Sequence, residues 1–173
     1  METPKEIYRR FCRETEPLPV FLQDWWLDAV CIGGTWDAVT VGDGEHTKAV
    51  MPFYTVKGRL GHTFLSVPLL TPFLGPWLHY PPGQKNASKL SYEKNILAEL
   101  IGQLPPFSQF SQNFHYSVTN GLPFYWEGFS LGTGYTYVLP DLRDPDAVFA
   151  GFKENIRREI RKAQKQLTVC TDD

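Results

Sequence analysis

The pattern of apolar positions predicts two helices at the start of the chain. Thr3, Pro4 and Glu6 form the signature of a capping box with proline in the first turn, which predicts a helix that continues to about Arg13. A second helix is predicted over roughly 20–31, where apolar residues recur at helical spacing: Leu22, Trp25, Trp26, Ala29 and Val30. Because all of these lie on one helical face, we expect at least Trp25 to be in the core.

Further along the chain apolar residues recur at every second position, which predicts strands. Alternation favours strands over 36–41, 47–57 and 62–70, with glycine-rich turns at 42–44 and 58–61. Three strands with such short connections are typical of an antiparallel meander. Two more strands are predicted over 107–118 and 134–139.

Two more helices complete the pattern. Ser91 is placed to cap a helix that reaches about Leu104. Asp144 and Pro145 provide an N-cap and a first-turn proline for a last helix that reaches about Gln166. Together these elements predict an α+β fold, with a mostly antiparallel mixed sheet of about five to six strands flanked by three to four helices. We expect residues 1–173 to form a single domain.

Composition narrows the class of protein. The 173 residues include 17 Lys+Arg and 19 Asp+Glu, a formal charge of −2. The chain as a whole therefore has no positive electrostatic field that would attract nucleic acid. Three cysteines are an odd number, which disfavours a disulfide framework and indicates a reducing compartment. No stretch is apolar and long enough for a membrane span, and the start lacks the features of a signal peptide. We therefore expect a cytoplasmic protein.

Motifs for common chemistries are missing from the sequence. The His and Cys residues do not fall in metal-ligand spacing, and there is no phosphate-binding loop or nucleophile elbow. We therefore expect no metal site, and the catalytic residues stay unknown. Glu127 is the one acid worth testing as a catalytic group, although an exposed loop glutamate is the simpler interpretation.

The last predicted helix has a basic face. Six basic residues lie within 153–165: Lys153, Arg157, Arg158, Arg161, Lys162 and Lys165. Such a face is ordinary where an amphipathic helix meets water. It also fits an anionic ligand, because Arg157 and Arg161 are four residues apart and share one side of the helix.

Two aromatic loops, 72–80 and 123–129, are the other notable feature. Their aromatic side chains either fill the core beneath the loops or line a ligand groove. The second interpretation makes Trp77, Phe124 and Trp126 substrate-binding residues, and Tyr80, Lys85, Tyr125 and Tyr135 would supply polar contacts.

The order of these motifs resembles a known family. The chain has a Trp-containing helix at 21–27, a strand that ends in PLLTPFLG at 68–75, and the stretch NIRREIRKA at 155–163. This arrangement is similar to the N-terminal half of FemAB-type aminoacyl transferases and related proteins of the GNAT superfamily, which carry two GNAT-like domains in tandem. The resemblance supports Arg157, Arg161 and Lys162 as residues near an anionic ligand.

The resemblance implies acyl or aminoacyl transfer by a longer, two-domain protein. It implies that this chain is the N-terminal, substrate-binding half, that its partner is a missing C-terminal GNAT-like domain, and that it is not catalytically complete alone. The implied acceptor is an anionic small molecule or cell-wall precursor. The donor is aminoacyl-tRNA or an acyl-CoA bound by the complete protein, and this chain alone binds no cofactor.

The sequence departs from the GNAT pattern in one respect, the absence of the R/Q-x-x-G-x-G/A loop that binds the CoA pyrophosphate. The alternatives are a non-catalytic binding module for a peptide, glycan or nucleotide, and a structural half whose only partner is another domain.

Overall fold

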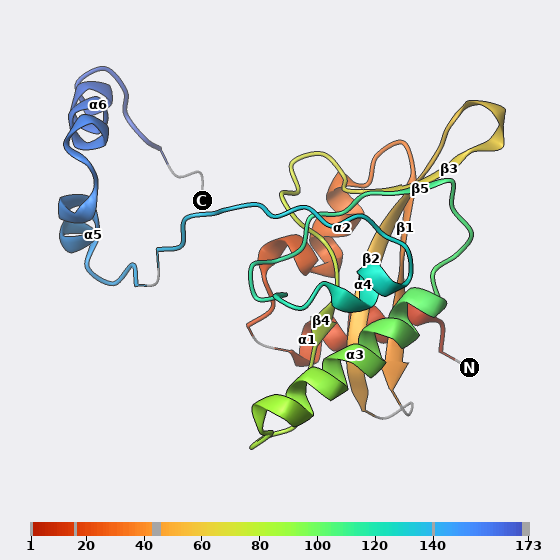
Figure 1. The fold of residues 1–173 in the computed structure, drawn as a ribbon. Coiled ribbons are helices and arrows are strands. Elements are labelled where there is room, and N and C mark those ends of the chain that lie inside the picture. Colours follow the sequence, from red (N-terminus) through yellow and green to blue (C-terminus); the bar gives the residue numbers. More distant parts are fainter. Residues whose placement is uncertain (1, 16, 43–45, 140, 171–173) are drawn as a thin grey trace. The chain divides into compact units, whose positions relative to one another are not determined.

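The chain divides into two compact units, Met1–Gly132 and Thr133–Asp173. A computed structural model describes residues 2–15, 17–42, 46–139 and 141–170 (Figure 1). Part of the turn predicted at 42–44 lies outside these residues. The first unit contains the sheet and most of the helices, and the second contains two short helices.

A five-stranded mixed sheet organises the first unit. Its strands are β1 (Thr35–Gly42), β2 (Thr47–Lys57), β3 (Thr63–Ser66), β4 (Trp77–Leu78) and β5 (Gln109–Phe110). β2 pairs antiparallel with β1, β3 and β4, and the two-residue β5 runs parallel to β3. The predicted α+β class with a mixed, mostly antiparallel sheet is therefore confirmed.

Pro52 lies in the middle of β2 at a break in the sheet. On one side β2 pairs with β1 along its length, and Pro52 is opposite Ala38. On the other side Ala49 and Val50 pair with β4, whereas residues 54–57 pair with β3, which leaves 51–53 between the two ladders. Proline has no N–H to donate. Its carbonyl accepts a hydrogen bond from the Gln112 side-chain amide at 3.2 Å instead of from a strand.

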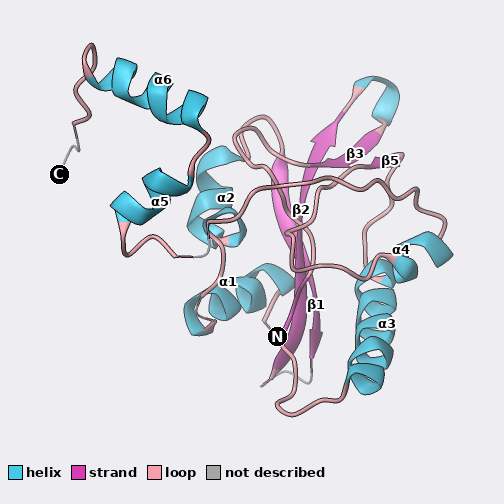
Figure 2. Cartoon of the chain, turned by 60° about the vertical axis from the view of Figure 1, so that its left-hand side comes forward, coloured by secondary structure: helices cyan, strands magenta, loops and turns pink. Residues whose placement is uncertain are grey.

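Helices cover both faces of the sheet (Figure 2). One face packs against α1 (Pro4–Glu14), η1 (Val20–Leu22) and α2 (Asp24–Val30). The other packs against α3 (Asn86–Gly102) and α4 (Leu122–Trp126). Alternation along β1 explains the two cores, because Trp36 and Ala38 belong to the first cluster and Val39 and Val41 to the second.

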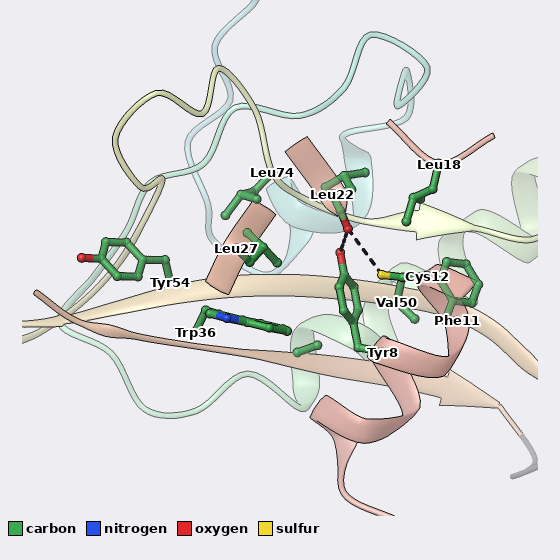
Figure 3. Packing of buried hydrophobic residues seen from close by; sticks show 11 residues of the cluster. Tyr8, Phe11, Cys12, Leu18, Leu22, Leu27, Trp36, Val50, Tyr54 and Leu74 are labelled. Carbon is green, nitrogen blue, oxygen red and sulfur yellow. Dashed lines mark hydrogen bonds between the residues drawn. The ribbon is translucent and has the colours of Figure 1, made fainter. Parts of the chain in front are cut away.

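The first cluster is joined by hydrogen bonds as well as by packing (Figure 3). The buried Tyr8 hydroxyl donates to the Leu22 carbonyl at 2.6 Å, and the Cys12 thiol donates to the same oxygen at 3.6 Å. Burial raises the pKa of the Cys12 thiol to about 11, so this cysteine is an unreactive core residue. At the start of α1, the predicted capping box is confirmed: the Thr3 N–H donates to the Glu6 carboxylate at 2.7 Å, and the Glu6 N–H donates to the Thr3 hydroxyl.

The second predicted helix is shorter than expected, and the expectation for Trp25 is wrong. Residues 20–22 form a 3₁₀ turn before α2 begins at Asp24, and this break rotates the helical face. The Trp25 side chain is 56% exposed, whereas Leu27 is fully buried. Trp26 is half-buried, and its indole N–H donates to the Thr71 hydroxyl at 3.0 Å.

Several element boundaries also differ from the predictions. The third strand covers only Thr63–Ser66, α3 begins at Asn86 rather than after Ser91, and only Gln109–Phe110 of the predicted 107–118 strand is extended in the sheet. The predicted strand at 134–139 is wrong, because its side chains are exposed and none of the described strands pairs with this segment. Apolar alternation does not form a strand without a partner.

The second unit contains α5 (Pro145–Gly151) and α6 (Glu154–Gln164). The predicted cap is present, since the Asp144 carboxylate accepts from the Ala147 N–H at 3.0 Å. The prediction of one continuous helix to Gln166 is wrong, because Phe152 and Lys153 have extended backbones. No residue of either helix is buried, so no packing offsets the low helix propensity of Gly151 at this break.

Candidate functional site

Two loop segments and α3 meet beside β4 in the first unit. The loop before β4 is tied to the segment after β5, because the Leu74 N–H donates to the Asn113 carbonyl at 2.8 Å. α3 is tied to the end of β4 by the Tyr92 hydroxyl, which donates to the His79 carbonyl at 2.8 Å. These contacts place residues 76–80, the first half of α3 and residues 117–120 around one space.

A pocket of about 230 Å³ occupies this space. Its walls come from β4 and the residues beside it, from α3, and from the segment that precedes α4. The lining residues are Pro76, Trp77, Leu78, Tyr80, Lys89, Glu93, Leu97, Ser117, Val118, Thr119 and Asn120. Apolar walls with a few convergent polar groups are typical of small-molecule sites.

Glu93 is the central polar group of the pocket. Its side chain is only 9% exposed. One carboxylate oxygen accepts from the Tyr80 hydroxyl at 2.8 Å, and the other accepts from the Asn120 side-chain amide at 3.1 Å. Both donors are neutral groups, and they hold the carboxylate in a fixed orientation.

Lys89 is the cation next to this carboxylate. One helical turn before Glu93, its ammonium nitrogen lies 3.9 Å from Glu93 Oε1 and 4.4 Å from the centre of the Tyr80 ring. The first distance is that of an ion pair without a hydrogen bond, and the second is that of a cation–π contact. The Lys89 side chain is 47% exposed, so it connects the pocket to solvent.

Tyr80 and His115 have shifted pKa values. Burial, together with the hydrogen bond to Glu93, raises the pKa of the Tyr80 hydroxyl, so it stays a donor at neutral pH. Partial burial lowers the pKa of His115, whose ring contacts the Phe73 and Trp77 rings with centroids 4.9 and 5.5 Å apart. The neutral form of His115 is favoured, and it supports the wall formed by Trp77.

The predicted binding residues of the first unit are not all at the pocket. Trp77 and Tyr80 line it, whereas Lys85 lies exposed at the N-cap of α3 and does not. Phe124 is 1% exposed and packs in the second core cluster, so it acts as a core residue beneath the loop. Trp126 is 59% exposed at the end of α4, a helix where a loop was predicted. Glu127 is exposed at the C-cap of that helix.

The remaining predicted residues belong to the second unit. Tyr135 is 98% exposed. On α6, Arg157 is half-buried, and its Nε has no hydrogen-bond partner within the described residues. The Arg161 guanidinium lies 5.3 Å from the centre of the Phe149 ring, and Lys162 is exposed.

Glu93, Lys89 and Asn120 line the pocket but were not predicted from the sequence. A signal for Glu93 was present, because this carboxylate lies three and four residues before Ile96 and Leu97 on the apolar stripe of α3. A charged residue in register with a buried stripe requires a polar partner. Nothing in the sequence indicates that Tyr80 and Asn120 provide it.

Comparisons with protein-family models, with curated proteins and with solved structures gave no match to this chain. Among residues 2–15, 17–42, 46–139 and 141–170, no group of His, Cys, Asp and Glu side chains is arranged to hold a metal ion. The same residues contain no helix with the length and apolar character needed to cross a membrane. The interpretation of the pocket therefore depends on its own geometry.

Proposed function

We propose that this chain is the N-terminal, substrate-binding half of a GNAT- or FemAB-like acyl- or aminoacyltransferase. The observation that carries the proposal is the pocket beside β4, which is lined by Trp77 and by a buried carboxylate, Glu93, that the Tyr80 hydroxyl holds in a fixed orientation. An α+β unit with a mixed sheet covered by helices on both faces is compatible with a GNAT-like domain. The pocket would hold an ammonium or neutral polar part of the acceptor, a cell-wall precursor or another anionic small molecule. The anionic groups of this acceptor would lie outside the pocket, because the Glu93 carboxylate repels them.

The second unit supports a role as part of a larger assembly. Its helices have no buried residue, although α6 has an apolar stripe and a basic face. We assign the apolar stripe to packing against the second GNAT-like domain, and Arg157, Arg161 and Lys162 to an anionic group of donor or acceptor. Acyl-CoA or aminoacyl-tRNA would be bound by the complete protein, in the cytoplasm.

Binding and transfer assays on matched variants test the proposal. A soluble peptidoglycan precursor, a UDP-linked muramyl pentapeptide, is titrated into the chain and followed by amide NMR shifts. We expect Glu93→Gln to weaken binding about tenfold or more, because a charged hydrogen-bond acceptor is lost. Glu99→Gln is the control, since Glu99 is exposed on the same helix.

Catalytic incompleteness is tested in the same samples. With aminoacyl-tRNA or acetyl-CoA as donor, the chain alone should transfer no acyl group, and transfer should require the second domain. Equal affinity of the two variants for the precursor, or transfer by the chain alone, would contradict the proposal.

A non-catalytic binding module is the second candidate. It is favoured by one observation: every residue that lines the pocket lies within the first unit, so the site needs no other domain. Binding of a peptide, glycan or nucleotide at Glu93 by a protein that shows no transfer with any donor would support this candidate over the first.

A further inference from the structure

The pocket at Glu93 contains a cation that belongs to the protein itself. The Lys89 ammonium lies beside both partners of the Tyr80–Glu93 hydrogen bond, 3.9 Å from Glu93 Oε1 and 4.4 Å from the centre of the Tyr80 ring. Carboxylates and aromatic faces both bind organic ammonium ions in proteins. The place that Lys89 occupies therefore has the chemistry of an ammonium-binding site.

Lys89 is a poor permanent partner for this site. Its nitrogen is too far from Glu93 Oε1 for a hydrogen bond, and nearly half of its side chain is exposed. A long, exposed side chain gains entropy when it leaves such a contact. Glu93, in contrast, is buried and is held by hydrogen bonds from Tyr80 and Asn120, neither of which involves Lys89.

The rest of the pocket accommodates a short alkyl chain. Apolar side chains form its walls, including Trp77, Leu78 and Leu97. The volume of about 230 Å³ exceeds that of a water molecule several times, so an aminoalkyl group fits beside the carboxylate.

We propose that Lys89 is a resident occupant of an ammonium-binding site, and that an organic ammonium ligand enters the pocket by displacing it. The inference rests on the proposed binding role of the pocket and not on the transfer reaction. The ligand ammonium is either the α-ammonium of an amino-acid derivative or the side-chain ammonium of a peptide lysine. The two sources have the same head group and differ in the carbon chain attached to it.

Removal of the resident cation tests the inference. n-Butylammonium is titrated into Lys89→Met and into the control Lys94→Met, at constant ionic strength, and the Trp77 indole and Asn120 amide signals are followed by NMR. Lys94 is exposed on the same helix, so the control removes the same charge away from the pocket. We expect Lys89→Met to bind about fivefold or more tightly than the control, because a self-occupied site binds ligand in proportion to the fraction that is open.

Two further titrations complete the test. n-Butanol, which has no charge, should bind Lys89→Met more weakly than n-butylammonium does. Alaninamide and Nα-acetyl-lysine amide distinguish the two sources of ammonium by their relative affinities.

Equal or weaker n-butylammonium binding by Lys89→Met than by Lys94→Met would overturn the inference, as would equal binding of the alcohol. If Lys89→Met binds n-butylammonium tightly but the muramyl pentapeptide causes no amide NMR shifts in the chain, this inference stands and the transferase proposal fails.

Discussion

The two units of this chain differ in whether a helix with a clear capping residue also packs into a core. In the first unit a capped helix, α1, places Tyr8, Phe11 and Cys12 in a core cluster. In the second unit a capped helix, α5, has an equally clear start at Asp144 but no buried residue. Capping residues determine where a helix begins, whereas tertiary contacts determine whether it contributes to stability.

The largest expected contrast comes from truncating an apolar side chain in each unit. Leu100→Ala should lower the free energy of unfolding by about 2–5 kcal/mol, because Leu100 is fully buried in the second cluster and truncation leaves a cavity. Ile156→Ala on α6 should change it by less than about 0.5 kcal/mol, because Ile156 is 46% exposed.

Urea unfolding followed by far-UV circular dichroism measures both effects, because both units contain helices, whereas all five tryptophans lie in the first unit. Leu90→Ala is the matched control, since Leu90 is 58% exposed on the same helix as Leu100. A destabilisation by Ile156→Ala as large as that by Leu100→Ala would show that the second unit has a core of its own.

Removal of each helix cap should give a smaller difference. Thr3→Ala should cost about 1 kcal/mol in global stability, because the capping box holds a helix that packs on the sheet. Asp144→Ala removes an equivalent cap from α5 and should leave the global unfolding midpoint unchanged. Amide hydrogen exchange should instead show faster exchange in Pro145–Gly151 alone. A shift of the global midpoint by Asp144→Ala would contradict the comparison.

The sequence predicts those features of the fold that depend on a few adjacent residues, and it fails for those that depend on distant partners. The capping box of α1, the alternation in β1 and β2 and the cap of α5 are properties of a few adjacent residues, and these predictions are confirmed. Trp25 and the 134–139 segment failed, because burial and strand pairing depend on partners distant in the sequence.

The candidate site shows the same limit. Trp77 and Tyr80 were predicted from their aromatic loop, and they line the pocket. Glu93, with partners 13 and 27 residues away, was not predicted, because its role appears only when β4, α3 and the 117–120 segment come together. The predicted resemblance to FemAB-type and GNAT proteins stays a prediction.

The smallest expected effect is a difference in acid sensitivity between two exposed carboxylates. The Arg9 guanidinium lowers the pKa of Asp28 below its usual value, and the Arg143 guanidinium lowers the pKa of Asp141 in the same direction. A lowered pKa in the folded state adds stability above the ordinary pKa, and this stability is lost as pH falls through the folded value. Arg9 joins α1 to α2, whereas Arg143 is two residues from Asp141, so only the first pair is coupled to global unfolding.

Urea midpoints between about pH 3 and pH 6 measure this difference. Asp28→Asn should reduce the loss of stability on acidification, and Asp141→Asn should leave it unchanged. Because both carboxylates are exposed, the effect of Asp28→Asn should be small. Identical pH profiles for Asp28→Asn and the unsubstituted chain would show that the Arg9 pair contributes nothing to folding.

Pro52 has a consequence for how this protein can change over evolution. β3 and β4 pair with β2 on either side of residues 51–53, and Pro52, in the middle of this gap, has no backbone N–H to donate. A single codon change at position 52 would restore the backbone N–H, which is one of the two groups that a further strand needs for pairing; the other, the carbonyl, is bonded to Gln112.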